Sequence, residues 1–252
     1  MNHSLKQRLD DAVARINTPE FIPHDPVQFP RMFSDTRDIE ITAILCSIIA
    51  WGARPMILRD CTRLLDMMER QPYRYVIDGD WESLPDRQNI HRTMFSSHLK
   101  YLLRGLKKIY ASHSSLDAFA AYCHAGDSDA PAWTFADKLQ RVMLDVNDGA
   151  YCPECLPSSL DKTALKRINM ALRWLVRDDG IVDLGIWNSI PKHKLYIPLD
   201  VHVGRISRAE GLLSRRSNDR KAVEQLTAAL REFDSTDPVR YDFALFGLGV
   251  KN

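Results

Sequence analysis

Apolar residues in this chain recur every three or four positions through most of its length, which is the spacing of a helix with one buried face. No stretch alternates between apolar and polar positions for long enough to indicate a β-sheet. The pattern therefore predicts an all-α fold. The expected helices cover approximately residues 4–16, 56–68, 94–110, 116–122, 132–146, 162–177 and 219–233.

Residues 39–51 are almost entirely apolar on every side, so we expect them to form the central buried helix. No stretch of the chain has the composition of a linker between autonomous domains, and we expect one compact unit over residues 1–252. Within it, residues 36–148 would form a central lobe. Residues 1–35 and 149–252 would form a second lobe.

The segment 195–208 passes from an extended run into a helix at Asp200. Pro198 disfavours helical geometry in the residue before it and has no amide hydrogen, so the chain arrives extended. Asp200 can then accept hydrogen bonds from the free amides of the first helical turn as an N-cap. We expect the helix to bury Val201 and to end at Gly211. A cap explains Asp200 without any function.

The predicted helix 162–177 carries an apolar face and, with the same period, a polar stripe. This pattern predicts a helix with one side in the core and a cationic side toward solvent. Such a stripe is commonly no more than a solvated face. Its members are Lys162, Lys166, Asn169, Arg173 and Arg177.

A lysine on a helix, followed by a helix-capping aspartate in an Ile-Pro-Leu-Asp-x-His-Val run, resembles the helix-hairpin-helix DNA glycosylase superfamily. The gap from Lys166 to Asp200 is closest to that of the archaeal oxoguanine glycosylases, whose hairpin is atypical. More narrowly, the chain resembles an uncharacterised bacterial family of helix-hairpin-helix glycosylase-like proteins. The matching segments are residues 21–30, 49–52, 91–93, 166–170, 179–180, 197–200 and 241–249.

The resemblance implies a two-lobed helical bundle that excises a damaged base flipped out of double-stranded DNA, with oxidised guanine as the leading candidate. Asp200 would be the catalytic carboxylate, stabilising the positive charge that develops on the sugar. Lys166 would be the nucleophile, forming a Schiff base if the enzyme also has AP-lyase activity. Lys162 is the alternative nucleophile, because Lys-Thr-Ala reads like the lysine after the usual hairpin. Residues 156–161 lack both glycines of that hairpin, which makes it atypical here.

Other residues of the pattern are candidate DNA contacts. Trp51 lies where glycosylases place a residue that fills the gap left by the extruded base, and Arg54 could contact the orphaned base. Packing of Trp51 under a loop is an equally good interpretation. Basic side chains near the two catalytic candidates would hold phosphates. These are Lys162, Arg167, Arg173 and His202.

Cys152 and Cys155 form half of a metal-binding pattern. Endonuclease III-like relatives hold an iron–sulfur cluster with four cysteines after the catalytic aspartate, whereas no cysteine follows Cys155 here. A zinc site would need a histidine from elsewhere in the chain, such as His193. The sequence therefore predicts no metal and no cofactor.

The formal net charge is +1, so a DNA-binding surface would have to come from local clustering of basic residues. The chain shows no secretory hydrophobic core, and its most apolar run is too short to span a bilayer. Five cysteines without a secretory segment indicate a reducing cytosol. We expect a cytoplasmic protein with no membrane partner.

Two other functions fit the same pattern. The chain could keep the fold as a catalytically silent nucleic-acid-binding protein, or it could be a helical protein-interaction module. In the second case Lys166 and Asp200 would be structural. The alternatives differ in one respect: the enzyme requires the lysine amine and the aspartate carboxylate to face one cleft wide enough for a base.

Overall fold

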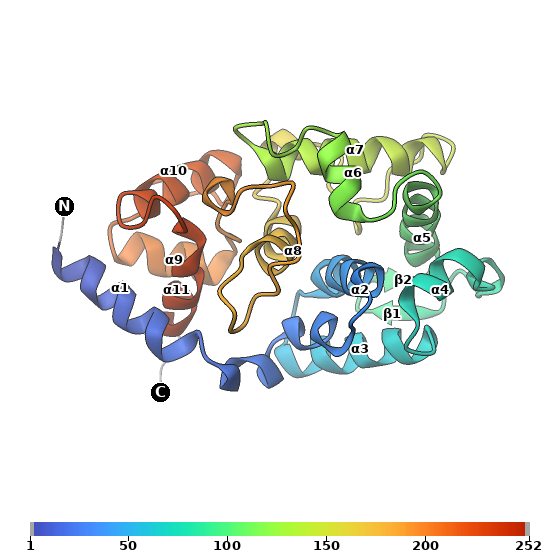
Figure 1. Ribbon diagram of the computed structural model, residues 1–252, viewed down its shortest axis with the longest axis horizontal. Coiled ribbons are helices and arrows are strands. Elements are labelled where there is room, and N and C mark those ends of the chain that lie inside the picture. The colour runs from blue at the N-terminus through green and yellow to red at the C-terminus, as the bar shows by residue number, and fades with distance from the viewer. Residues whose placement is uncertain (1–2, 250–252) are drawn as a thin grey trace.

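The computed structural model describes residues 3–249 and consists mainly of helices, which confirms the all-α prediction (Figure 1). The α-helices are α1 (His3–Ile16), α2 (Thr36–Ile49), α3 (Arg54–Met67), α4 (Pro72–Asp78), α5 (Ser96–Tyr110), α6 (Leu116–Tyr122), α7 (Pro131–Asp145), α8 (Lys166–Val176), α9 (Val201–Ala209), α10 (Arg220–Arg231) and α11 (Tyr241–Gly249). Short 3-10 turns are η1 (Pro19–His24), η2 (Pro26–Gln28), η3 (Pro30–Met32), η4 (Trp81–Ser83), η5 (Leu160–Lys162), η6 (Lys192–Lys194) and η7 (Pro238–Arg240).

The sequence pattern missed one small β-hairpin. Strand β1 (Asn89–His91) pairs antiparallel with β2 (Met94–Phe95), and Arg92 at the tip has a left-handed backbone with φ of 51°. Two such short strands are below the length at which an alternating pattern becomes recognisable. The hairpin nevertheless contributes to the site, because its tip reaches the loop after α2.

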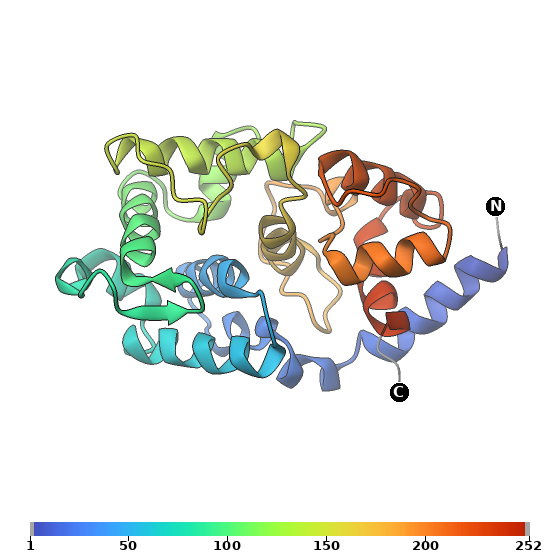
Figure 2. The ribbon, with the colours of Figure 1, turned by 180° about the vertical axis from the view of Figure 1, so that it is seen from behind.

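Helices from distant parts of the chain lie side by side (Figures 1 and 2). The first helix, α1, packs along the last, α11, and α11 also packs on α9. Helices α2 to α7 and the hairpin form the other side of the molecule. Helix α8 lies between these two groups and packs against α2 and α7. The N-terminus of α8 is thereby placed between the loop after α2 and the start of α9.

Helix α2 is buried along almost its whole length, as the all-round apolar pattern predicted. Its single buried carboxylate, Glu40, accepts hydrogen bonds from Tyr110 Oη at 2.9 Å and from Trp187 Nε1 at 2.8 Å. It also accepts the free amides at the start of α6. Full pairing is what makes a buried carboxylate tolerable. Glu40 therefore fastens α5, α6 and the loop containing Trp187 to the central helix.

The sequence predicted a helix that extends to Trp51, but α2 ends at Ile49. Trp51 therefore belongs to the following loop. Gly52 in this loop has φ of +109°, a conformation that side chains disfavour. A Cβ at this position would lie 2.6 Å from the Arg92 guanidinium. The glycine thus allows the hairpin tip to approach the loop closely.

Helix α8 begins at Lys166, four residues later than predicted, because Leu160–Lys162 form the separate turn η5. The prediction of a solvent-facing cationic stripe is wrong for its second half. Asn169, Arg173 and Arg177 are all buried. Helix α8 is therefore enclosed on its polar side as well as on its apolar side.

Carboxylates from remote segments explain this burial. Asp183 accepts from Arg173 Nε at 3.2 Å and from an Arg177 guanidinium nitrogen at 2.8 Å. Arg173 also pairs with Asp242 of α11, and Arg177 pairs with Asp237 at 2.9 Å. A buried guanidinium is stable only with such partners. The network joins α8 to the 178–190 loop and to the C-terminal helices.

Within residues 3–249, no helix combines the length and the apolar character needed to cross a bilayer.

Candidate functional site

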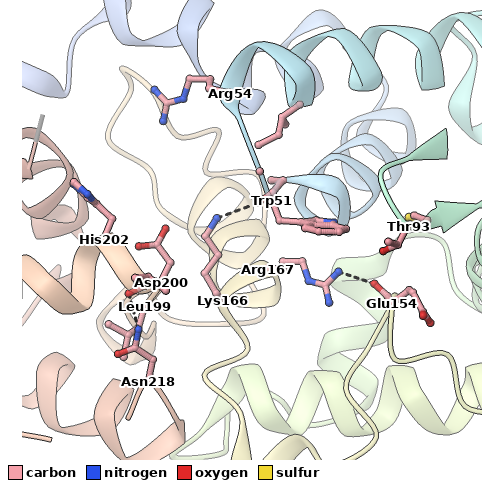
Figure 3. Close-up of a pocket in the computed structure, with 15 residues that line it drawn as sticks. Trp51, Arg54, Thr93, Glu154, Lys166, Arg167, Leu199, Asp200, His202 and Asn218 are labelled. Carbon is pink, nitrogen blue, oxygen red and sulfur yellow. Dashed lines mark hydrogen bonds between the residues drawn. The ribbon is translucent and has the colours of Figure 1, made fainter. Parts of the chain in front are cut away.

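A cleft with a volume of about 780 Å³ opens between the loop after α2 and the N-termini of α8 and α9 (Figure 3). Its volume falls within the range of small-molecule and cofactor sites. Smaller contributions to its walls come from the β-hairpin, the loop before α8 and the loop before α10. The lining residues are Ala50, Trp51, Gly52, Arg54, Ile57, Thr93, Met94, Glu154, Lys166, Arg167, Leu199, Asp200, Val201, His202 and Asn218.

Lys166 enters the cleft from the first position of α8. The preceding residue, Leu165, has a left-handed backbone with φ of 46°, which is costly for a branched side chain and turns the chain sharply into the helix. Lys166 Nζ lies 3.4 Å from the carbonyl oxygen of Ala50. Burial lowers the pKa of this lysine, while the charge of Asp200 raises it. A lowered pKa increases the fraction of free, nucleophilic amine near neutral pH.

Asp200 is the N-cap of α9, as predicted, and its Oδ1 accepts from the backbone amide of Val203 at 2.9 Å. Asn218 fixes the same residue from the other side, because its Nδ2 donates to the Asp200 carbonyl at 2.9 Å. The predicted burial of Val201 is wrong, since this side chain is 80% exposed at the edge of the cleft. The helix ends near Gly211 (φ +74°), as predicted.

The cap does not use up the Asp200 carboxylate. Among the hydrogen bonds of residues 3–249, only Oδ1 accepts one from the protein. In Figure 3 the carboxylate and the Lys166 side chain lie side by side, with the amine turned toward the Ala50 carbonyl. An amine and a carboxylate that are 34 positions apart in the sequence thus share one opening.

A smaller hollow of about 140 Å³ continues from the cleft past these two residues. Lys166, Asp200, Arg54 and His202 line both spaces, so the pair stands at the junction. Aromatic and apolar side chains form about half of the wall of the hollow, and the other lining residues are ionisable. The apolar ones are Phe21, Met170, Pro198, Val203, Phe243 and Phe246.

Two carboxyl groups, Asp25 and Asp242, face the same hollow. Burial raises the pKa of Asp242 to about 6, and the nearby Asp200 charge acts in the same direction. The guanidinium of Arg173 opposes this shift. Asp25 uses Oδ1 to cap the turn η2 and leaves Oδ2 3.7 Å from Arg54. The hollow therefore offers hydrogen-bond acceptors beside its aromatic side chains.

His202 has an unpaired polar atom at this junction. Its Nε2 is buried and has no hydrogen-bond partner among residues 3–249. Native proteins rarely leave a buried polar atom unpaired, so each such case needs a reason. A bound ligand would supply the missing partner. Arg54, above it, places its guanidinium 4.7 Å from the ring centre of Phe246.

Trp51 lines the cleft, and its ring is also in contact with Arg92 of the hairpin. The guanidinium of Arg92 lies 4.4 Å from its ring centre, a cation–π contact. Its carbonyl accepts from Nε2 of the buried His91, and Nδ1 of His91 contacts Asp60 Oδ2 at 2.7 Å. His91, which belongs to the resembling segment 91–93, therefore anchors the Trp51 loop.

The remaining predicted DNA contacts fall in three different environments. Arg167 lines the cleft but is fixed there by two carbonyls, those of Ile48 at 3.0 Å and Glu154 at 2.6 Å. Lys162 is exposed on η5 and is not among the residues lining the cleft or the hollow, which argues against it as the nucleophile. Arg173 lines the hollow but is buried and paired with Asp183 and Asp242, which argues against it as a phosphate contact.

Sequence reasoning missed several residues of the site, because they come from segments without a catalytic pattern. Asn218 and Asp25 are ordinary polar residues in loops, and Asp242 follows a tyrosine at the start of the last helix. Phe243 and Phe246 lie in the apolar run of the same helix, which by itself predicts core packing and no function. Their place in the resembling segments 21–30 and 241–249 is the one signal that pointed to them.

Side chains able to ligate a metal gather at the rim of the cleft. Within residues 3–249 one such group is formed by His98, Cys152 and Glu154. Of these, Glu154 also lines the cleft.

A protein-family model described as "Protein of unknown function (DUF2400)" matches residues 25–251 of this chain. No curated protein and no solved structure matches it. The matched range contains all the residues that line the cleft and, except for Phe21, all those that line the hollow. It includes Lys166, Asp200 and Asp242.

Proposed function

This chain belongs to the DUF2400 family, which is described as a family of unknown function. From the geometry of its site we propose that it is a DNA-repair glycosylase with associated AP-lyase activity. The enzyme would remove a damaged base that has been flipped out of duplex DNA. One observation carries this proposal. The Lys166 amine and the Asp200 carboxylate open on the same cleft, at the mouth of an aromatic hollow.

The chemistry follows from these two groups. When the bond between base and sugar breaks, the electron pair leaves with the base and positive charge develops at the sugar C1′. The Asp200 carboxylate, oriented by Val203 and Asn218, would stabilise that charge. The free amine of Lys166 would then form a bond to C1′, and opening of the sugar ring gives a Schiff base. Elimination of the 3′ phosphate from this intermediate would cut the strand.

The hollow suits a flipped base. Its aromatic and methionine side chains provide apolar surface for a planar ring, which is how such enzymes hold an extruded base. Asp25 and Asp242 are acceptors for N–H groups on the base edge. Oxidation of guanine at C8 adds an N–H at position 7 that guanine lacks. Oxidised guanine is therefore the substrate that we favour.

The DNA backbone would meet the basic residues around the opening. Arg54 is partly exposed above the cleft, whereas the unpaired Nε2 of His202 is buried at the junction and would meet only the flipped-out nucleotide. Trp51 could enter the space left by the base after releasing Arg92. The net charge of +1 means that these few residues, and not the overall field, would attract the DNA. We place the activity in the cytosol, where the five free cysteines would remain reduced.

The proposal is tested with duplex oligonucleotides that carry 8-oxoguanine, uracil, hypoxanthine or an abasic site. The purified protein should release 8-oxoguanine, and Asp200→Asn should slow release by about 100-fold or more, as expected for loss of one electrostatic group in a dry site. DNA binding by this variant should persist. Salt-sensitive binding without base release on any lesion would contradict the proposal and favour a silent DNA-binding protein.

A further inference from the structure

The loop between α7 and α8 brings sulfur, nitrogen and oxygen ligands together beside the start of α5. The thiols of Cys152 and Cys155 lie 3.1 Å apart, and Cys152 Sγ lies 3.8 Å from Glu154 Oε2. From α5, His98 Nε2 lies 4.0 Å from the same carboxylate oxygen. The ligand atoms of His98, Cys152 and Glu154 all lie within 4.8 Å of one another.

We propose that His98, Cys152, Glu154 and Cys155 form a structural zinc site that clips this loop to α5. Two thiolates, one imidazole and one carboxylate are a donor set that Zn²⁺ takes in tetrahedral geometry. The sequence alone offered only the cysteine pair and suggested the distant His193. The fold instead supplies His98, which precedes the pair by more than fifty residues.

The local backbone already has the shape that such a pair requires. The amides of Cys155 and Leu156 both donate to the Cys152 carbonyl at 3.0 Å, forming a tight turn that points the two sulfurs to one side. With Zn–S bonds of about 2.3 Å, two thiolates on a tetrahedral ion lie roughly 3.7 Å apart. The pair would therefore open by about half an ångström. A disulfide would instead require a sulfur–sulfur distance of about 2.05 Å.

The surrounding charges also favour a cation with thiolate ligands. A hydrogen bond from Cys155 lowers the pKa of the Cys152 thiol. Burial holds the pKa of Cys155 well above its usual range, although the Arg167 charge opposes this effect. Zinc would displace both protons, since thiolates bind it as anions. Arg167 would offset part of the negative charge that two thiolates and a carboxylate leave on the site.

Several existing hydrogen bonds would be lost. As thiolates, Cys155 could no longer donate to the His98 carbonyl at 3.4 Å and Cys152 could no longer donate to Cys155 or Glu154. His98 Nδ1 accepts from the Phe95 amide at 3.2 Å, whereas a zinc-bound Nε2 places the ring proton on Nδ1. The contact is long and lies near the surface, so water can replace it. The zinc–ligand bonds replace these weak thiol contacts as well as the lost Phe95 contact. The site would hold the Glu154 carbonyl, and through it Arg167, at the rim of the cleft.

The test measures metal in protein purified without chelators. Elemental analysis should find about one zinc per chain. Cys152→Ser and Cys155→Ser should each lose it, while Cys123→Ser, a buried cysteine outside the cluster, should keep it. After removal of zinc, Co²⁺ should give the near-ultraviolet thiolate charge-transfer band and the visible bands of a tetrahedral ion.

A second variant guards against misfolding of the cysteine mutants. Glu154 is exposed, so Glu154→Ala should leave the fold intact and weaken zinc binding at least about tenfold, as even outer-shell changes do at such sites. Two results would overturn the proposal. One is that the purified protein contains no zinc and that adding Co²⁺ to it produces no thiolate charge-transfer band. The other is an intact mass two hydrogens short, with a Cys152–Cys155 disulfide. Neither result bears on base release by Lys166 and Asp200.

Discussion

Burial displaces the pKa values of two residues at the junction of cleft and hollow, in opposite directions. It lowers that of Lys166 and raises that of Asp242 to about 6. Both shifts have the same cause, because a low-dielectric environment disfavours the charged form of either group. The lysine thereby becomes a better nucleophile. The carboxyl becomes sensitive to pH in the range where a glycosylase would work.

Base release should therefore depend on the ionisation of Asp242. If its carboxylate accepts from the base, single-turnover release of 8-oxoguanine should rise as pH increases through about 6. Below that value the rate should fall about tenfold per pH unit. Asp242→Asn should remove this acidic limb, and Asp178→Asn, on an exposed carboxylate, should retain it. An unchanged acidic limb in Asp242→Asn would exclude this carboxyl from the role.

The same shift gives a stability prediction of known sign. A carboxyl whose pKa is higher in the folded state than in the unfolded state stabilises the fold while it is protonated. That contribution should be complete below about pH 4 and should disappear as pH rises to about 6. The free energy of unfolding, measured by urea titration at a series of pH values across this window, should fall with increasing pH for the wild type. For Asp242→Asn it should lack this contribution to the pH dependence. Parallel curves of unfolding free energy against pH for the two proteins would show that the pKa of Asp242 is not raised in the folded state.

At the scale of elements, the position of Asp200 depends on a glycine in the helix that it caps. A Cβ on Gly204 would lie 2.7 Å from Asn218 Oδ1 and 2.7 Å from the Arg208 guanidinium. Asn218 can therefore reach the Asp200 carbonyl only because position 204 has no side chain. The geometry of the proposed catalytic carboxylate is thus set jointly by α9 and the loop before α10.

Gly204→Ala should displace Asn218 and loosen the start of α9. We expect base release to fall roughly five- to tenfold, which corresponds to loss of one neutral hydrogen bond of about 1 kcal/mol. Asn218→Ala should have the same effect, and the double variant should lose no more than either single one, since both act on one contact. Additive losses, measured under single-turnover conditions, would show that the two residues act separately.

The sequence predicted elements well where local patterns decide them. The buried character of α2 and the Asp200 cap with its Gly211 stop follow from apolar period and capping chemistry, and the structure confirms them. The polar side of α8 was misjudged, because the partners of Arg173 and Arg177 lie in other segments. The hollow could not be predicted for the same reason. The residues that line it come from segments far apart in the sequence, which are brought together only when α11 packs against the rest of the fold.

At the scale of the whole molecule, the buried ion network around α8 holds the two sides together. Asp183 is fully buried and is the one carboxylate that pairs with both Arg173 and Arg177 among residues 3–249. Removing one partner of a buried ion pair leaves a charge without compensation, which costs far more than the pair itself contributes. This network lies directly behind the wall that carries Lys166.

Asp183→Ala should lower the free energy of unfolding by about 3–5 kcal/mol in urea titrations. Asp178→Ala is the matched control, because it breaks an exposed 2.6 Å pair with Lys192 in the same loop. That change should cost about 1 kcal/mol or less. Equal losses in the two variants would mean that the buried network contributes no more than a surface ion pair.

Borohydride trapping on duplex DNA tests the role of Lys166 most directly, since reduction fixes the Schiff base between enzyme and sugar. The wild type and Lys162→Gln should both give a covalent complex with 8-oxoguanine or abasic duplex, because Lys162 is outside the cleft. Lys166→Gln should give none, although it still binds the DNA. Undiminished trapping by Lys166→Gln, or its loss in Lys162→Gln alone, would contradict the assignment.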